Sequence, residues 1–215
     1  GEELAAGYGV NAEITWLLDN NEVHLDPMTN PDGRKFAEAG YYWRKNTNNT
    51  NGCASWEYPY FGTDLNRNST FLWGGAGTNP CGETYQGPQA GSEPETQSIE
   101  EYVSDLFTDW RGEALTDPAP EDTQGVFVTL HSFGGYVLYP WGWSDVEAPN
   151  SAGLRRLGLK FGYYNRYLVC QSGAANCLHP TTGSTDDWAY GTLGIPSYTF
   201  ELGSSFFQDC FSFLN

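Results

Sequence analysis

The sequence predicts an α/β fold in which a mixed, twisted sheet is flanked by helices. Short apolar runs typical of strands alternate along the chain with longer segments whose apolar residues recur at helical spacing. The 215 residues suit one compact domain, and no repeat, heptad array or linker divides them. With 39% hydrophobic and 16% aromatic residues, the chain carries enough apolar surface to form a core.

Three segments are expected to be helical. Residues 11–19 gather their apolar side chains on one face and follow the end of another helix around Leu4. Ser92 begins a Ser-Glu-Pro-Glu run with the spacing of a capping box, so a helix is predicted from there to about residue 107. Residues 150–168 carry one long apolar stripe, which predicts a third helix.

Four segments are expected to be strands: residues 22–28, 126–131, 136–139 and 197–202. His131 ends one of them and Glu201 closes another, and ligands of open α/β sheets bind beyond the strand ends. A lone histidine is often packed in a core, and a lone glutamate is often a surface carboxylate. Since the chain has three histidines, a metal site built from its residues would need carboxylate ligands as well.

Composition excludes some partners. Ten basic and 27 acidic residues give a net charge of −17, which repels nucleic acid and anionic membranes and favours solubility. No apolar run approaches the roughly 18 residues that cross a bilayer. The chain opens on Gly1 without a visible signal peptide, so we expect a mature, trimmed or partial chain.

The five cysteines predict disulfides in an oxidising compartment. They are Cys53, Cys81, Cys170, Cys177 and Cys210. None forms a Cys-x-x-Cys pair, which argues against a structural zinc site and favours two disulfides with one thiol left over. We therefore expect a secreted protein. Asn48 and Asn68 begin glycosylation sequons.

Short motifs make the chain similar to a known family. They are Asn30-Pro31-Asp32-Gly33, Trp43-Arg44-Lys45, Asp64-Leu65-Asn66-Arg67-Asn68, Leu130-His131-Ser132 with Leu138-Tyr139-Pro140, Asp187-Trp188-Ala189-Tyr190 and Thr199-Phe200-Glu201-Leu202. In this order, from about Tyr8 to Phe207, they resemble zinc metallocarboxypeptidases of the carboxypeptidase A/B family, closest to the secreted bacterial and digestive types. The resemblance implies one catalytic domain over residues 1–215 that is incomplete at both ends. Asn30 to Gly33 are expected to form a turn.

The resemblance also implies roles for five residues. His131 matches the family's third zinc ligand, and Glu201 matches the carboxylate that takes a proton from zinc-bound water and passes it to the leaving amine. Arg44 matches the arginine that polarises the scissile carbonyl. Asn66 and Arg67 match the pair that binds the terminal carboxylate, for which a planar guanidinium is well suited. Taken singly, the two arginines are equally typical of surface residues.

Three further positions follow from the resemblance. The His-x-x-Glu motif that supplies two of the three zinc ligands is absent from this chain. His179 stands where the family usually has a mobile tyrosine that closes over the substrate. Asp186 stands at the base of the pocket for the C-terminal side chain, which implies a basic preference or a dual basic and apolar one. Its alternative role is to cap the helix that begins near Asp187.

The resemblance thus implies a Zn²⁺-dependent carboxypeptidase that acts on peptide or protein C-termini, and we expect it to be monomeric. The resemblance further implies a Cys53–Cys81 disulfide, and the short loop between Cys170 and Cys177 suggests the second. With two zinc ligands missing, we expect the chain by itself to bind zinc poorly and to be inactive. Two alternatives stay open: a zinc amidase acting on a small acylated or cell-wall peptide, and a non-catalytic module such as a pseudoenzyme or carbohydrate binder.

Overall fold

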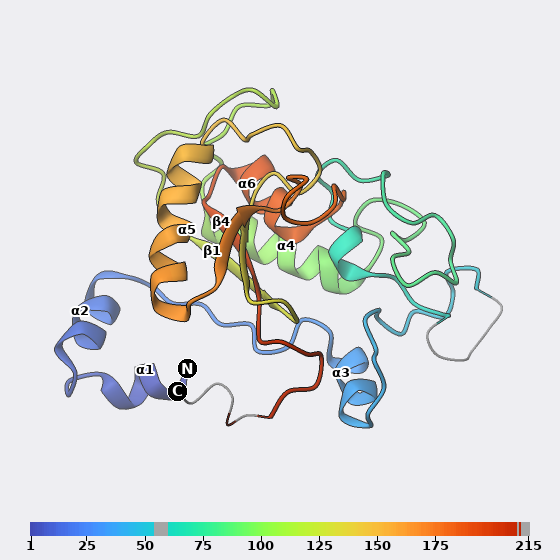
Figure 1. Ribbon diagram of the computed structural model, residues 1–215, viewed down its shortest axis with the longest axis horizontal. Helices are drawn as coiled ribbons and strands as arrows, with labels where there is room; N and C mark the ends of the chain where they lie inside the picture. The colour runs from blue at the N-terminus through green and yellow to red at the C-terminus, as the bar shows by residue number, and fades with distance from the viewer. Residues whose placement is uncertain (54–59, 210, 212–215) are drawn as a thin grey trace.

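A four-stranded mixed sheet forms the centre of the protein (Figure 1). The computed structural model describes the whole chain except residues 54–59, 210 and 212–215. The strands are β1 (Phe127–His131), β2 (Tyr136–Tyr139), β3 (Leu168–Gln171) and β4 (Ser197–Glu201). The helices are α1 (Glu2–Gly7), α2 (Ala12–Asn20), α3 (Pro31–Glu38), α4 (Pro94–Leu106), α5 (Ser151–Asn165) and α6 (Thr185–Leu193), with a 3₁₀ turn η1 (Leu65–Arg67). The predicted fold class is confirmed.

The register of the sheet places two of the predicted site residues side by side. The strand order is β1-β4-β2-β3; β4 runs parallel to β1 and antiparallel to β2, while β2 and β3 are parallel. In the β1–β4 ladder, His131 and Glu201 are register partners at the last position of both strands. Because side chains alternate between the faces of a sheet, partners in register project from the same face. The two residues therefore share one face and one edge.

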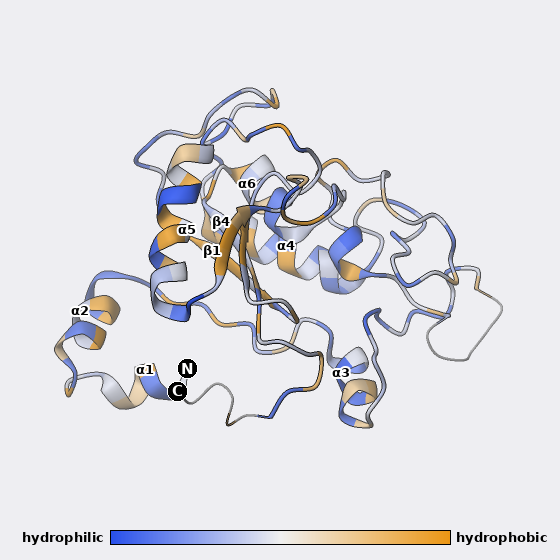
Figure 2. Ribbon diagram, in the orientation of Figure 1, coloured by the Kyte–Doolittle hydropathy of each residue, from blue (hydrophilic) through white to orange (hydrophobic). Residues whose placement is uncertain are grey.

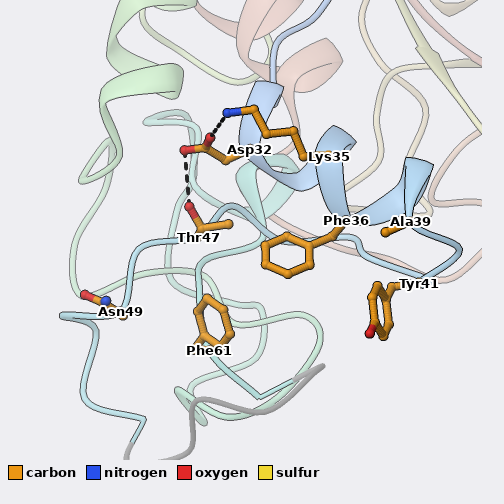
Figure 3. Close-up of a pocket in the computed structure, with 8 residues that line it drawn as sticks. All are labelled: Asp32, Lys35, Phe36, Ala39, Tyr41, Thr47, Asn49 and Phe61. Carbon is orange, nitrogen blue, oxygen red and sulfur yellow. Dashed lines mark hydrogen bonds and ion pairs between the residues drawn. The ribbon is translucent and has the colours of Figure 1, made fainter.

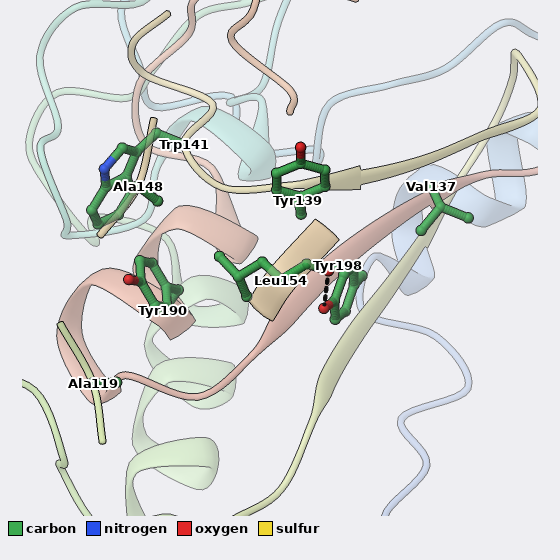
Figure 4. Close-up of a cluster of buried hydrophobic side chains, with 8 residues drawn as sticks. All are labelled: Ala119, Val137, Tyr139, Trp141, Ala148, Leu154, Tyr190 and Tyr198. Carbon is green, nitrogen blue, oxygen red and sulfur yellow. Dashed lines mark hydrogen bonds between the residues drawn. The ribbon is translucent and has the colours of Figure 1, made fainter. Parts of the chain in front are cut away.

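Helices cover both faces of the sheet. α5 packs on β2 and β3, whereas α6 packs on β4 and β1 (Figure 1). Leu154 of α5 is buried in a cluster that includes Tyr198 of β4. The Tyr198 hydroxyl donates to the Leu154 carbonyl at 2.8 Å (Figure 4). Trp141 packs on Tyr190 with ring centroids 4.9 Å apart, which joins α6 to the segment after β2. Apolar residues accordingly concentrate on the sheet and on the inward faces of the helices (Figure 2).

The amino-terminal segment lies apart from this core. α1 and α2 contact one another and contain no buried residue (Figure 1). Both predicted helices are confirmed, and Asn11 caps α2 by accepting hydrogen bonds from the backbone N–H groups of Glu13 and Ile14. Within the residues that the structure describes, no helix is both long and apolar enough to span a bilayer.

Two predictions were wrong: the strand at residues 22–28, and the end of the helix that precedes β3. Residues 22–28 do not form a strand, since no described strand lies alongside to supply hydrogen bonds, and His24 instead bonds the hydroxyl of Tyr102 on α4 at 2.7 Å. The helix predicted to end at residue 168 stops at Asn165. Arg166 there takes a left-handed φ of 65°, and the residues after it pair with β2 as β3.

The predicted turn at Asn30 and the predicted helix start at Ser92 also differ from the structure. Asn30 does not begin an isolated turn: it caps α3, with its side chain accepting from the Gly33 N–H at 3.0 Å. Ser92 does not cap α4, because its hydroxyl donates to Glu93 at 2.7 Å, and the cap position is Glu93, with the helix beginning at Pro94. Asn30 thus begins a helix that was predicted as a turn, whereas Ser92 lies next to the predicted helix start without capping it.

The structure contains both predicted disulfides, Cys53–Cys81 and Cys170–Cys177. Cys210 lies outside the described residues. One sequon is sterically blocked, because Asn68 is fully buried and its amide nitrogen donates to the Gln86 carbonyl at 2.9 Å.

Leu154 provides a test of the core beneath α5. It is 3% exposed, so Leu154→Ala is expected to lower the free energy of unfolding by about 2–5 kcal/mol through lost burial and a residual cavity. Leu159 lies on the same helix but is 46% exposed, and Leu159→Ala should change stability by no more than about 0.5 kcal/mol. Urea denaturation of both variants provides the comparison. Equal losses would show that α5 does not pack as described.

Candidate active site

A cavity of about 130 Å³ opens where β1 and β4 end, and we call it the strand-end cavity. Six of the residues singled out in the sequence line it: Arg44, Asn66, Arg67, His131, Asp186 and Glu201. Its remaining lining residues are Leu138, Ser172, Leu178, Thr181, Ser184 and Thr199. Residues more than 150 positions apart in the chain thus meet in one place. His179 is exposed and does not line the cavity, although its neighbours Leu178 and Thr181 do.

Arg44 is oriented by a buried carboxylate. Its Nε donates to Asp64 Oδ2 at 2.7 Å, and the Asp64 side chain is only 3% exposed. Burial alone lowers the pKa of Arg44, but the nearby Asp64 outweighs burial, so the net effect is a raised pKa and a permanent positive charge. Asp64 also caps η1, accepting from the Asn66 N–H at 3.2 Å. One carboxylate therefore positions both Arg44 and the turn that carries Asn66.

Asn66 and Arg67 sit on that turn with part of their hydrogen-bonding capacity already used. The Asn66 Oδ1 accepts from the Thr185 backbone N–H at 3.0 Å and lies 3.3 Å from the Thr185 hydroxyl. Within the part of the chain that the structure describes, this leaves the Asn66 Nδ2 as a donor for a ligand. Burial lowers the pKa of Arg67, Asp64 opposes that change and Arg44 adds to it, but an arginine stays charged at any ordinary pH.

The two strand-end residues have shifted pKa values that suit proton transfer and metal binding. Burial raises the pKa of Glu201; Arg44 opposes the rise and Asp186 adds to it. A carboxylate with a raised pKa is a better proton acceptor near neutral pH. Burial, followed by the charge of Arg44, lowers the pKa of His131, which favours the neutral imidazole that metals bind. The His131 Nε2 lies 3.2 Å from the Thr129 hydroxyl.

Asp186 and Asp187 open α6 but have different surroundings. Asp186 is 3% exposed and lines the cavity; the helix cap is Ser184, so Asp186 does not serve as the cap. Asp187 accepts from the backbone N–H groups of Gly142 and Trp143, each at 2.8 Å. Burial and the adjacent Asp186 raise the pKa of Asp187 well above its ordinary value. Asp187 therefore joins the segment after β2 to the helix turn that presents Asp186.

The described residues do not form a zinc site by themselves. Among them, no group of three or more histidine, cysteine, aspartate or glutamate side chains lies close enough to hold a metal ion. His131 contributes one imidazole in the cavity, and His24 is occupied by Tyr102 elsewhere. Because a catalytic zinc site uses three protein ligands, the residues present do not fit the complete metal centre.

A second, larger pocket of about 520 Å³ lies beside α3 (Figure 3). Phe36, Tyr41 and Phe61 line it, and its polar side holds Asp32 paired with Lys35 at 3.0 Å. None of the predicted site residues reaches it. The side chains suited to binding and proton transfer therefore line the smaller strand-end cavity, which contains two arginines and two carboxylates.

Comparison with known proteins supports the same fold. A family model described as zinc carboxypeptidase matches residues 2–212. This match covers nearly the whole chain, and the protein therefore belongs to the zinc carboxypeptidase family, whose members are metallopeptidases.

Individual relatives support the same assignment. Carboxypeptidase A1 of Rattus norvegicus is 30% identical over 94% of this chain and 45% of its own length. A zinc carboxypeptidase of Simulium vittatum is 32% identical over 89% of this chain and 60% of its own. The structure of carboxypeptidase A from Helicoverpa armigera superposes with a TM-score of 0.65 at 25% identity, covering 97% of this chain and 51% of that one. The chain thus spans about half the length of the relatives it matches.

Two positioning residues were not singled out by the sequence. Asp64 and Asp187 each fall inside a quoted motif, yet their roles depend on partners 20 and 45 positions away. Asp64 precedes a turn, and aspartate at that position is a recognisable capping signal. No local signal identifies the pairing of Asp187 with the segment after β2.

Glu201→Gln is expected to stabilise the folded protein at neutral pH. Because the folded pKa of Glu201 lies above its unfolded value, the folded state binds more protons between the two values, and stability falls as pH rises through that interval. Above the folded pKa, the ionised buried carboxylate lowers the free energy of unfolding, and the neutral amide of glutamine avoids this loss. We expect a gain of about 0.5–1 kcal/mol at pH 7 that disappears below the unfolded pKa of glutamate. Thermal unfolding across pH 3–8 (roughly spanning both pKa values) measures it, and a gain independent of pH would contradict the assignment.

Proposed function

We propose that this chain forms the substrate-binding and proton-transferring part of a zinc-dependent carboxypeptidase that removes single residues from peptide C-termini. The observation that carries the proposal is the meeting of Arg44, Arg67 and Glu201 around one small cavity at the strand ends. Two fixed cations next to a carboxylate with a raised pKa suit a substrate that brings a free carboxylate and a bond to be hydrolysed.

Each side chain has a distinct part in this proposal. Asn66 and Arg67 bind the terminal carboxylate, since the amide nitrogen and the planar guanidinium both donate. Arg44, oriented by Asp64, donates to the scissile carbonyl and stabilises the negative charge that develops on its oxygen. Glu201 accepts a proton from the attacking water and then returns it to the leaving amine.

Asp186 supplies the preference for the C-terminal side chain. Its carboxylate lies in the cavity and is almost fully buried, so a cationic side chain that enters would gain a charge-assisted hydrogen bond in a poorly solvated place. Leu138 and Leu178 also line the cavity and provide apolar contact. A basic or dual basic and apolar preference follows.

His131 is proposed as one zinc ligand. Since the described residues do not provide two more, we propose that this chain by itself binds zinc weakly and has no peptidase activity. In that state it would still recognise a C-terminal carboxylate, which is the behaviour of a binding module. The disulfides support a secreted protein.

Asp186→Asn tests the specificity assignment directly on this chain. N-acetyl-L-arginine should bind the variant about 10- to 100-fold more weakly, because one partner of a charged hydrogen bond is lost. N-acetyl-L-phenylalanine, which shares the carboxylate but lacks the cation, is the matched control and should bind both proteins equally. NMR titration gives both affinities. A similar loss for the two ligands would show that Asp186 does not contact the side chain.

Zinc titration by calorimetry tests the metal assignment. The 215-residue chain should bind Zn²⁺ more than about 100-fold more weakly than a version extended upstream to include a His-x-x-Glu segment. Peptidase activity should appear with the extended version alone. Tight one-to-one binding by the short chain that His131→Ala abolishes would show that the remaining ligands lie within these residues.

A further inference from the structure

Lys45, the residue after Arg44, is buried in an unusual environment. It is 2% exposed, and its Nζ donates to the carbonyls of Gly82 at 2.8 Å and Pro80 at 3.1 Å, with the Tyr60 carbonyl at 3.5 Å. Within the described residues, it forms no ion pair with a carboxylate. Lysine is almost never fully buried without a charged partner, since an ammonium loses its hydration when it is taken out of water.

The two closest carbonyls flank Cys81, one partner of the Cys53–Cys81 disulfide. The Lys45 ammonium therefore connects the backbone that carries Arg44 to a loop that is itself covalently closed. The backbone around it is held as well: the Lys45 carbonyl accepts from the Asn30 side chain at 2.9 Å. The side-chain bonds of Lys45 thus link this backbone to the residues on either side of Cys81.

Burial makes this arrangement costly, which argues that it does more than fill space. It lowers the pKa of Lys45 to about 8, with Asp64 and Glu83 opposing the change from a distance, and the Tyr85 ring centroid lies 5.9 Å from Nζ. An apolar side chain of similar length would occupy the same volume without losing hydration. The bonds that the ammonium makes are thus the property that distinguishes lysine here.

We propose that Lys45 is a positioning residue for Arg44, fixing the guanidinium over the strand-end cavity by anchoring its backbone to the disulfide-closed loop. Asp64 orients the Arg44 side chain from one direction, and Lys45 immobilises the main chain from the other. The consequence for ligand binding rests on the proposed function of Arg44, whereas the coupling between the two side chains does not.

Carbon-detected NMR of the Arg44 Nε–Cζ group tests the coupling in the absence of any ligand. In Lys45→Met, the Arg44 Nε–H should lose hydrogen-exchange protection by about tenfold, as expected when a charged hydrogen bond that holds its segment is removed. Lys35→Met is the matched control: Lys35 is an exposed lysine on α3 paired with Asp32 at 3.0 Å, and its loss should leave Arg44 unchanged. A Lys45→Met protein with lowered stability but unaltered Arg44 signals would make Lys45 merely structural and overturn the proposal.

The unmodified chain provides a second measurement that does not depend on how the variant folds. Between pH 6 and 10 (roughly two units either side of its midpoint), the Lys45 Cε signal should titrate near pH 8, and the Arg44 signals should shift with the same midpoint. Arg44 signals that stay constant through the Lys45 transition would contradict the proposal.

Binding of N-acetyl-L-arginine separates this inference from the proposed function. If Lys45→Met mobilises Arg44 and also weakens the ligand, both stand. If Arg44 is mobilised while the affinity is unchanged, the positioning role of Lys45 stands and the assigned contact of Arg44 with the substrate fails.

Discussion

The parallel pairing of β1 with β4 is the constraint on which the candidate site depends. It brings His131 and Glu201, 70 positions apart in the chain, to the same edge and the same face of the sheet. A shift of register by one residue would turn one of them to the opposite face, where α5 packs. The buried contacts of β4, above all those of Tyr198 with α5, therefore hold the register that places His131 beside Glu201, and they stabilise the core as well.

Segments outside the sheet supply further charges at that edge, and buried hydrogen bonds hold these segments in place. Arg44 depends on Asp64, and Asp186 depends on the helix turn that Asp187 joins to the segment after β2. These supporting carboxylates are nearly inaccessible to water, so each bond they make is worth more than it would be at the surface. Side chains outside the sheet can be held firmly when the polar groups that support them are hydrogen-bonded in this way.

The fold and the site were predictable from the sequence to different extents. The strand at residues 126–131 is a nearly continuous apolar run, and six of the seven residues proposed for the site line the strand-end cavity, the exception being His179. The pattern at residues 22–28 resembled a strand. A strand also needs a neighbouring strand to bond its backbone, and the local sequence does not show whether one lies alongside. Leu168, the first residue of β3, was assigned to the preceding helix because it continued the helical stripe, and no strand was predicted over the rest of β3. Lys45 appeared in a quoted motif without a role, because its partners lie near Cys81, far along the chain.

The burial of Asn68 has a consequence for how the protein can be made. Its side chain lies entirely inside the fold and donates to the Gln86 carbonyl and to the Ser92 hydroxyl, so the native state has no room for a sugar there. In cells that attach oligosaccharides to nascent chains, any molecule modified at Asn68 before it folds would be unable to close the loop next to η1. Such molecules would be retained by quality control, and a host that adds no N-linked sugars is the natural choice for producing this chain.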